Sequence, residues 1–155
     1  MRSVHHQAQR LANPQAPEAA MAALHAARRF AEALDRDDFE SAAGLLSAHC
    51  VYEARAGRFT GASAVVGSYR EASDWVKCHL ESVSYTSHVE AMDGAQAAVL
   101  FVDHIGHLGR SHTYRCRQIL TIGPNGLIDK IQHMELPGER EALSGFLASV
   151  SLSLG

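Results

Sequence analysis

The hydrophobic positions in the first part of the chain repeat at helical spacing. Apolar residues recur every three or four positions over residues 18–34, and Pro17 suits the first turn of the amphipathic helix that this period predicts. Asp37 stands three residues before a glutamate, as in a capping box, and predicts a second, shorter helix that ends near Ser47. A third amphipathic helix is expected over residues 62–81.

The pattern then changes to segments that favour strands. β-Branched and aromatic residues gather in short runs, separated by turn signals such as Asp-Gly at residues 93–94 and Pro-Asn-Gly at residues 124–126. Residues 56–61 are expected to form a turn, and a closing helix is expected over residues 139–150. The predicted strands cover residues 50–55, 83–92, 97–107, 113–122 and 127–135.

This order of elements predicts an α+β fold. Two helices, a short strand and a third helix precede four consecutive antiparallel strands, and helices segregated from such a meander are typical of that class. We expect a cone-shaped roll in which a curved antiparallel sheet packs against three N-terminal helices, with a short C-terminal helix. The 155 residues suffice for one domain, so we expect a polar, mobile leader over residues 1–17 and a single domain over residues 18–155.

Composition and charge narrow the class of partner. Lys and Arg number 14 and Asp and Glu number 17, and the resulting net charge of −3 argues against a nucleic-acid binder, which would carry a basic patch. No apolar run reaches the roughly 18 residues that a membrane span needs, and the N-terminus lacks the apolar stretch of a signal peptide. Cys50, Cys78 and Cys116 form no CxxC pair and fit the reducing cytoplasm, where we expect the protein.

The sequence offers no recognisable cofactor or metal site. It contains no GxxxxGK[ST] phosphate loop, no GxGxxG dinucleotide motif and no GxSxG nucleophile elbow. His104, His107 and His112 lie close in sequence, but a His-x-x-His spacing on a strand places the two imidazoles on opposite faces. A single site would need a bend at Gly106 and a third or fourth ligand. We therefore expect no cofactor and no metal.

Three stretches, taken in order, carry a resemblance to a known family. They are LDRDDFESAAGLLSAHCVYEARAG at residues 34–57, FTGASAVVGSYR at residues 59–70 and RCRQILTIGPNGLIDKIQHMELPGEREAL at residues 115–143. Together they resemble the SnoaL-like branch of the nuclear transport factor 2-like superfamily over residues 19–150. The resemblance implies a largely apolar cone, no cofactor and, in the members that are enzymes, acid–base side chains whose pKa values the cone shifts. Other members only bind ligands or proteins, so the fold does not settle the function.

The resemblance also implies where a site would lie. Limonene epoxide hydrolases carry a tyrosine and an asparagine two apart on the first strand, and here Tyr52 matches the tyrosine while Ala54 stands at the asparagine's place. Their arginine and aspartate of the middle strand fall on Phe101 and Asp103, and their second aspartate, on the last strand, falls on His133. Ketosteroid isomerases carry their basic aspartate near Ala54, so a mechanism of that kind is not expected. The resemblance thus implies a catalytic dyad of Asp103 and His133 at the base of the cone, with Tyr52 as a hydrogen-bond donor.

Further side chains are candidates to bind a ligand in the cone. Trp75 and Tyr69 can stack on an apolar ligand or pack in the core, and Cys116 lines the pocket or is a buried inert thiol. A register slip of one residue would exchange Asp103 for His104 as the inward group, leaving the aspartate hydrogen-bonded elsewhere. The candidate ligand-binding residues are Trp75, Tyr69, Phe101, Ala54, Cys116 and His104.

Two functions remain open from the sequence. The first is a small cofactor-independent enzyme, either a hydrolase, an isomerase, a dehydratase or a cyclase, that acts on a small, mainly apolar molecule. The alternative is a non-catalytic ligand-binding or accessory protein with the same cone, which the apolar Ala54 and Phe101 favour. The resemblance also implies a homodimer through the sheet. Arg115 and Arg117 share one face, as an anion clamp or as a solvated or dimer-facing row.

Overall fold

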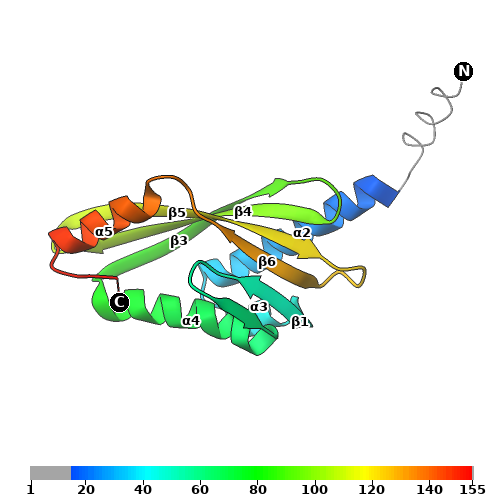
Figure 1. The fold of residues 1–155 in the computed structure, drawn as a ribbon, viewed down its shortest axis with the longest axis horizontal. Coiled ribbons are helices and arrows are strands. Elements are labelled where there is room, and N and C mark those ends of the chain that lie inside the picture. Colours follow the sequence, from blue (N-terminus) through cyan, green and yellow to red (C-terminus); the bar gives the residue numbers. More distant parts are fainter. Residues whose placement is uncertain (1–14, 155) are drawn as a thin grey trace, which may run out of the picture.

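The computed structural model describes residues 15–154 and confirms an α+β fold, in which helices pack against one curved sheet (Figure 1). Within these residues, no helix is long and apolar enough to cross a membrane. The helices are α2 (Gln15–Asp35), α3 (Phe39–Ala43), α4 (Ala62–His79) and α5 (Glu139–Ser149). The strands are β1 (Leu46–Glu53), β2 (Arg58–Thr60), β3 (Ser82–Ala91), β4 (Gln96–His107), β5 (Arg110–Ile122) and β6 (Ile128–Met134).

The first helix begins slightly earlier than the sequence predicts. The helix expected over residues 18–34 is α2, which runs from Gln15 to Asp35. Most of the leader expected over residues 1–17 lies outside the described residues, and its last three residues belong to α2. Pro17 therefore lies in the first turn, where the N–H that it lacks would have no partner within the helix.

The six strands form one mixed sheet in the order β2-β1-β6-β5-β4-β3. The four strands from β3 to β6 pair antiparallel, as the sequence predicts. The sheet is not antiparallel throughout, because β1 pairs parallel with β6, for example Tyr52 with Ile131. The segment expected to be a turn at residues 56–61 contains the three-residue strand β2, which pairs with β1. The last strand in the chain therefore lies between the first strand and the meander.

Small residues let α2 lie close to the sheet. Ala23, Ala27 and Ala31 are fully buried along one side of this helix, and Phe30 beside them is fully buried as well. The Phe30 ring meets the ring of Tyr69 from α4 edge-on, at 5.8 Å between centroids. The helix thereby closes one side of the space above the inner face of the sheet, and its C-terminal end points into that space.

The C-terminus of α2 is a Schellman-type turn whose left-handed residue is an aspartate. The Asp37 N–H donates to the Leu34 carbonyl at 3.0 Å, and the Asp38 N–H donates to the Ala33 carbonyl at 2.8 Å. Asp37 has a φ of 55°, a conformation that glycine adopts with least strain. The side chain is thus present at a position where the backbone alone would favour glycine, and its carboxylate lines the cavity described below.

The short helix α3 differs from the prediction at both ends. Asp38, rather than Asp37, is its N-cap, because the Asp38 carboxylate accepts a backbone N–H of α3 at 3.1 Å. The helix ends at Ala43 instead of near Ser47, since Leu46 and Ser47 already belong to β1 and are buried. Pairing of β1 with β6, which begins at Leu46, therefore overrides the helical propensity of Leu45 and Leu46.

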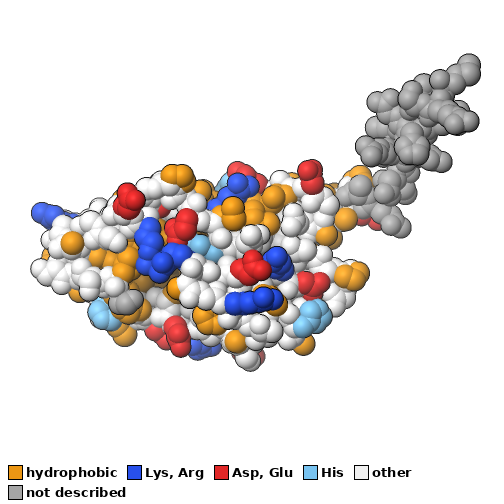
Figure 2. Space-filling model, viewed as in Figure 1, with side chains coloured by type: hydrophobic (Ala, Val, Ile, Leu, Met, Phe, Trp, Pro, Cys, Tyr) orange, Lys and Arg blue, Asp and Glu red, His pale blue; other side chains and the backbone are white. Residues whose placement is uncertain are grey.

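The apolar interior has two parts. The main core lies between α2, α3, α4 and the inner face of the sheet. A smaller cluster gathers under α5, around Leu80, Ile105 and Leu147. On the face shown in Figure 2, acidic and basic side chains are interspersed with apolar ones rather than gathered by sign. One cavity is lined partly by residues of the main core, and a second by residues of the cluster under α5.

Candidate functional site

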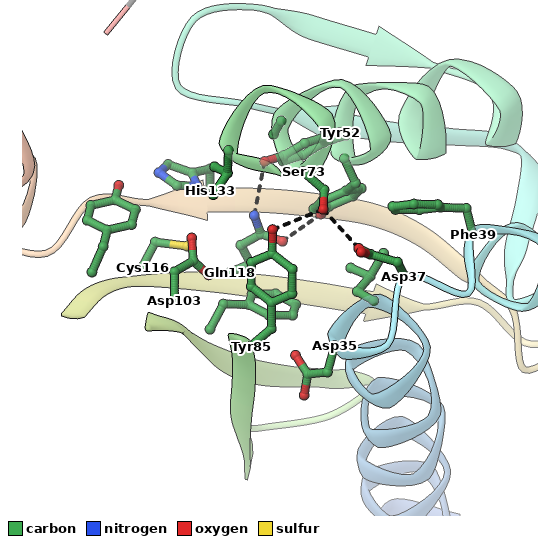
Figure 3. Close-up of a pocket in the computed structure, with 16 residues that line it drawn as sticks. Asp35, Asp37, Phe39, Tyr52, Ser73, Tyr85, Asp103, Cys116, Gln118 and His133 are labelled. Atoms are coloured by element: carbon green, nitrogen blue, oxygen red, sulfur yellow. Dashed lines mark hydrogen bonds between the residues drawn. The ribbon is translucent and has the colours of Figure 1, made fainter. Parts of the chain in front are cut away.

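The inner face of the sheet, α4 and the turn after α2 enclose a cavity of about 220 Å³ (Figure 3). Apolar atoms make up most of the surface of its wall, but three carboxylates, four tyrosine hydroxyls and the side chains of Ser73, Gln118 and His133 also line it. Figure 3 shows Asp103 and His133 on the sheet, Asp35 and Asp37 at the end of α2, and Ser73 on α4. A cavity whose wall is mainly apolar and in which polar groups converge is the common form of a small-molecule site.

The strand register fixes which side chains face this cavity. Tyr85 pairs with Asp103 and Asp103 pairs with Tyr114, so these three residues form a row across β3, β4 and β5, and all three line the cavity. His104 is exposed on the opposite face, where its Nε2 lies 3.0 Å from the Thr86 hydroxyl oxygen. The inward group is therefore Asp103. His104, a candidate ligand-binding residue from the sequence, does not line the cavity, because neighbouring strand residues point to opposite faces.

The Asp103 carboxylate lies in apolar surroundings. Within residues 15–154, no hydrogen bond or ion pair supports it. Burial raises the pKa of Asp103 from 3.8 to about 6, and the charge of Asp35 adds a smaller increment. Burial also raises the pKa of Asp35, although the Ser87 hydroxyl donates to its Oδ2 at 2.5 Å. When a carboxylate loses water and gains no protein donor, its pKa rises toward neutral pH, and it becomes a stronger base than a solvated carboxylate.

Gln118 joins two tyrosines of the cavity wall. Its buried side chain accepts a hydrogen bond from the Tyr69 hydroxyl at 2.6 Å and donates one to the Tyr52 oxygen at 3.0 Å. The two tyrosine rings are stacked, with centroids 5.0 Å apart and an angle of 4° between planes. Burial raises the pKa of Tyr52 to about 12 and the pKa of Tyr69 well above its usual value, so both stay protonated. Because the Tyr52 oxygen accepts from Gln118, its own proton can be donated into the cavity.

A second chain of hydrogen bonds links Tyr85 to the end of α2. The Ser73 hydroxyl donates to Asp37 Oδ1 at 3.0 Å, and its oxygen lies 2.9 Å from the Tyr85 hydroxyl. Since the Ser73 proton is used by Asp37, the Tyr85 hydroxyl is the donor in the second bond. Lys77 pairs with the same carboxylate, and this hydrogen bond raises the pKa of Lys77. The Asp37 side chain therefore has a structural use that accounts for an aspartate in the left-handed turn.

His133 lies on the same cavity wall but does not contact Asp103. It pairs with Gln118 across β5 and β6, whereas Asp103 pairs with Tyr114 across β4 and β5, so the two lie on opposite sides of β5 and at separate levels. His133 Nε2 is 3.3 Å from Glu135 Oε1, and its buried Nδ1 has no hydrogen-bond partner in the described chain. The two side chains form no direct dyad. They can act together only on a ligand that reaches both.

The remaining candidates from the sequence divide between cavity and core. Phe101 and Cys116, which are paired across β4 and β5, both line the cavity. Burial, with a contribution from the charge of Asp103, raises the pKa of Cys116 to about 12, so its thiol stays neutral and is a poor nucleophile. Ala54 packs beside the main core and does not line the cavity. Trp75 lines a second, neighbouring cavity.

Sequence reasoning missed several polar groups of the site. Tyr85 and Tyr114 flank Asp103. The two-residue alternation of β3 and β5 could have placed both tyrosines on the inner face, but only together with the register of the two hairpins. Gln118 has the same parity as Cys116 on β5, which places both on the inner face. Ser73 had no local signal, because its role depends on how α4 lies against the end of α2.

This arrangement supplies several proton acceptors and donors. Among the acceptors, Asp103 can take up a proton, and the Tyr52 hydroxyl can donate a hydrogen bond to an oxygen that gains negative charge. Such side chains are suited to acid–base chemistry. Across residues 15–154, the structure brings together no group of three or more His, Cys, Asp or Glu side chains suited to a metal ion.

No family model matches the sequence, and no curated protein matches it either. Solved structures do match. A proposed polyketide cyclase from Xanthomonas campestris pv. campestris has a TM-score of 0.63 and 16% identity, over 86% of this chain and 99% of that one. An LEH-like epoxide hydrolase from M. tuberculosis has a TM-score of 0.61 and 18% identity, over 84% and 96% of the two chains. A proposed ketosteroid isomerase from Kribbella flavida DSM 17836 has a TM-score of 0.59 and 22% identity, over 80% and 88%.

These matches confirm the fold that the sequence resemblance implies. The protein has the cone-like α+β fold of SnoaL-like and nuclear transport factor 2-like proteins, over most of its length. The names of the three matching proteins describe different reactions, so the shared fold alone assigns no reaction to this chain.

Proposed function

We propose that this protein is a cofactor-independent enzyme that moves a proton on a small, mainly apolar molecule, as an isomerase or a cyclase does. The observation that carries the proposal is the Asp103 carboxylate, which is half-buried in the wall of the cavity and accepts no hydrogen bond from the described residues, and whose pKa is raised to about 6 by loss of water. Such a base is ionised at neutral pH yet poorly solvated. This combination favours removal of a proton from a carbon next to a carbonyl group.

The proposed reaction begins when Asp103 takes the proton from that carbon. The C–H electron pair forms a carbon–carbon double bond, and the carbonyl π electrons move to oxygen to give an enolate. The Tyr52 hydroxyl donates a hydrogen bond to the enolate oxygen. Where a second C=C bond is conjugated to the enolate, the oxygen electron pair re-forms the carbonyl, the new double bond shifts by one carbon, and the π pair of the second C=C bond takes the proton from Asp103 at its far carbon. Alternatively, the enolate carbon attacks a second carbonyl and the proton goes from Asp103 to the new alkoxide. In either case Asp103 ends the cycle ionised, as it began.

Two observations support Tyr52 as the donor. Its pKa of about 12 keeps the phenol protonated at neutral pH, so it acts as a donor and not as a competing base. Its oxygen already accepts from Gln118, so its own proton remains to be donated to a ligand. Phe101 and Cys116 line the same cavity and add apolar contact surface for a ligand.

The experiment that tests this proposal is deuterium exchange into simple ketones, followed by NMR. In D₂O, the protein should replace the α-hydrogens of cyclohexanone or 1-tetralone faster than buffer does. Because Asp103 must be ionised to act, the rate should rise with pH, reach half its maximum near pH 6 and be flat above about pH 7. The His104→Ala variant, changed on the opposite face of the same strand, should keep this profile. An exchange rate that does not depend on pH between 5 and 8 would contradict the proposal.

The exchange assay, combined with calorimetry, separates catalysis from simple binding. Ala54 and Phe101 place hydrocarbon where the resemblance implies polar groups of a hydrolase, which favours a ligand-binding protein as the second candidate. If calorimetry detects ketone binding and no exchange above the buffer rate, the cavity binds without transforming its ligand. The enzymatic proposal would then be abandoned.

We also propose that two copies associate through the outer face of the sheet. Leu100, Val102 and Ile119 lie on that face and are only partly buried in the single chain, next to Arg115 and Arg117. Burial of these apolar side chains would favour association. Light scattering should give a mass near twice the 16.8 kDa of one chain, and Val102→Arg should reduce it to one chain, whereas Ala142→Arg on α5 should not. A wild-type mass near that of one chain at micromolar concentration would rule the dimer out.

The state of the cysteines supports a reducing compartment for this proposed enzyme. Cys50, Cys78 and Cys116 are all free thiols in the structure. Thiols that form no disulfide are usual in the cytoplasm, so we propose that the protein works there.

A further inference from the structure

A second cavity, of about 340 Å³, adjoins the first at Asp103. Residues of α4, α5 and the segment after α5 line it together with residues of the sheet, and Figure 1 shows α5 at the end of the molecule where α4 also ends. Asp103 and Tyr114 line both cavities, as do Ala72 and Val76 of α4. The two cavities are therefore neighbouring compartments, and the proposed base lies at their boundary.

The rest of the second wall is apolar. Trp75 contributes its indole ring, which stacks on the His79 imidazole at 4.4 Å between centroids. His79 Nδ1 also donates to the Trp75 carbonyl at 2.7 Å, so this end of α4 is held in place. The other side chains that line this cavity and not the first one are Leu80, Ile105, Leu143, Leu147 and Leu154.

Part of this wall is incompletely covered by the chain itself. Trp75, Leu143 and Leu154 are only half-buried, although they pack against the small cluster under α5. Apart from Asp103 at the boundary, no charged side chain of residues 15–154 lines the compartment. An apolar compartment of this kind takes up hydrocarbon more readily than water, and a charged group would be desolvated there without a partner.

We propose that the second cavity binds the uncharged hydrocarbon arm of a two-part ligand, whose polar head lies in the first cavity at Asp103. The position of the head rests on the proposed function, whereas binding of the arm depends only on the second wall. The arm is an alkyl chain or an alicyclic ring. Because Asp103 lies between the compartments, the reacting atom lies near the middle of the ligand. The second cavity then selects ligands by the length of their hydrocarbon arm.

The test is calorimetric titration with 4-alkylphenols, from 4-methylphenol to 4-hexylphenol, at pH 7.5. The phenol hydroxyl is a donor for the Asp103 carboxylate, and the alkyl group extends into the second cavity. Each added methylene that is buried should lower Kd about fourfold until the compartment is full. A wild-type affinity that does not rise with alkyl length overturns the proposal.

Two variants place the effect in this cavity. Leu143→Trp fills it from α5, and Leu154→Trp fills it from the segment after α5. Each should leave 4-methylphenol binding within about twofold of wild type and remove the gain from longer chains. Ala142→Trp is the matched control, since this neighbour on α5 is exposed and should keep the gain. If both filling variants fold by circular dichroism and keep the gain, the arm binds elsewhere and the proposal is wrong.

The titration and the ketone exchange assay can fail separately. A dependence on alkyl length without ketone exchange supports the hydrocarbon site and removes the proposed catalysis. Ketone exchange that depends on Asp103, without any dependence on alkyl length, supports the catalysis and overturns the hydrocarbon site.

Discussion

Replacing Asp103 with Asn is expected to slow proton transfer by at least about 100-fold and, at the same time, to make the protein more stable. The loss of rate follows because the asparagine amide cannot take up the proton, and a positioned general base contributes about 10²–10⁴-fold. The gain in stability follows because the wild-type carboxylate is ionised at neutral pH in a place that raises its pKa from 3.8 to about 6.

The pH dependence of this gain has a defined sign. The folded protein binds the Asp103 proton more tightly than the unfolded chain does, so the free energy of unfolding falls as the pH rises from about 4 to about 6. At pH 7 the ionised group destabilises the native state by up to about 3 kcal/mol. The Asp103→Asn variant should therefore melt on the order of 5–10 °C higher at pH 7. At pH 4, the free energy of unfolding of the variant should exceed that of wild type by less than about 1 kcal/mol.

Scanning calorimetry of both proteins at pH 4, 5.5 and 7 measures this change, and ketone exchange measures the rate. Asp38→Asn is a control of opposite sign, because hydrogen bonds from Ser41 lower the pKa of the Asp38 carboxyl. That variant should be less stable than wild type at pH 7. If Asp103→Asn is also less stable at pH 7, Asp103 is a satisfied structural group and is not the proposed base.

Replacing Gln118 with Leu is expected to lower the free energy of unfolding by about 2–4 kcal/mol. The leucine has a similar volume but leaves the Tyr69 hydroxyl without its acceptor and the Tyr52 oxygen without its donor. Each buried polar group that loses its partner costs about 1–3 kcal/mol. Urea denaturation of the wild-type and variant proteins measures the difference.

A triple variant tests the origin of that loss. Tyr52→Phe and Tyr69→Phe, added to Gln118→Leu, remove all three polar groups and leave the stacked rings in place. Since apolar replacement of every partner leaves nothing unsatisfied, stability should return to within about 1 kcal/mol of wild type. If Gln118→Leu alone costs nothing, the two hydroxyls find other partners and the network does not fix the proton of Tyr52.

The local elements of the fold could be predicted from the sequence because their signals are local. The repeat of alanines and Phe30 marks α2, and the alternation from Val83 onward marks the meander. Two features were not predicted. The strand β2 is only three residues long and pairs with β1 across a short turn, so its residues carry the signal of a turn rather than of a strand. The parallel pairing of Val51 with Lys130 joins distant segments, and that partner is not visible in a local window of sequence.

The site could be predicted only in part for a similar reason. The resemblance indicated Asp103 and His133 as cavity residues, but the parity of β4 needed the register that pairs Asp103 with Tyr85 and Tyr114. The separation of Asp103 from His133 follows from two registers in succession, across β5, and no pattern within either strand contains it. Side chains whose partners come from another helix, such as Ser73, need the packing of whole elements.

The position of β6 between β1 and β5 also sets the order in which the protein can be completed during synthesis. β1 cannot join the meander until β6 has emerged and paired on both of its edges. Tyr52 and Asp103 thus belong to separate parts of a nascent chain until β6 has paired with both β1 and β5. Non-local pairing of this kind slows folding, because loop closure must precede the contacts that stabilise it. The cavity that Tyr52 and Asp103 line is consequently incomplete until β6 has joined the sheet.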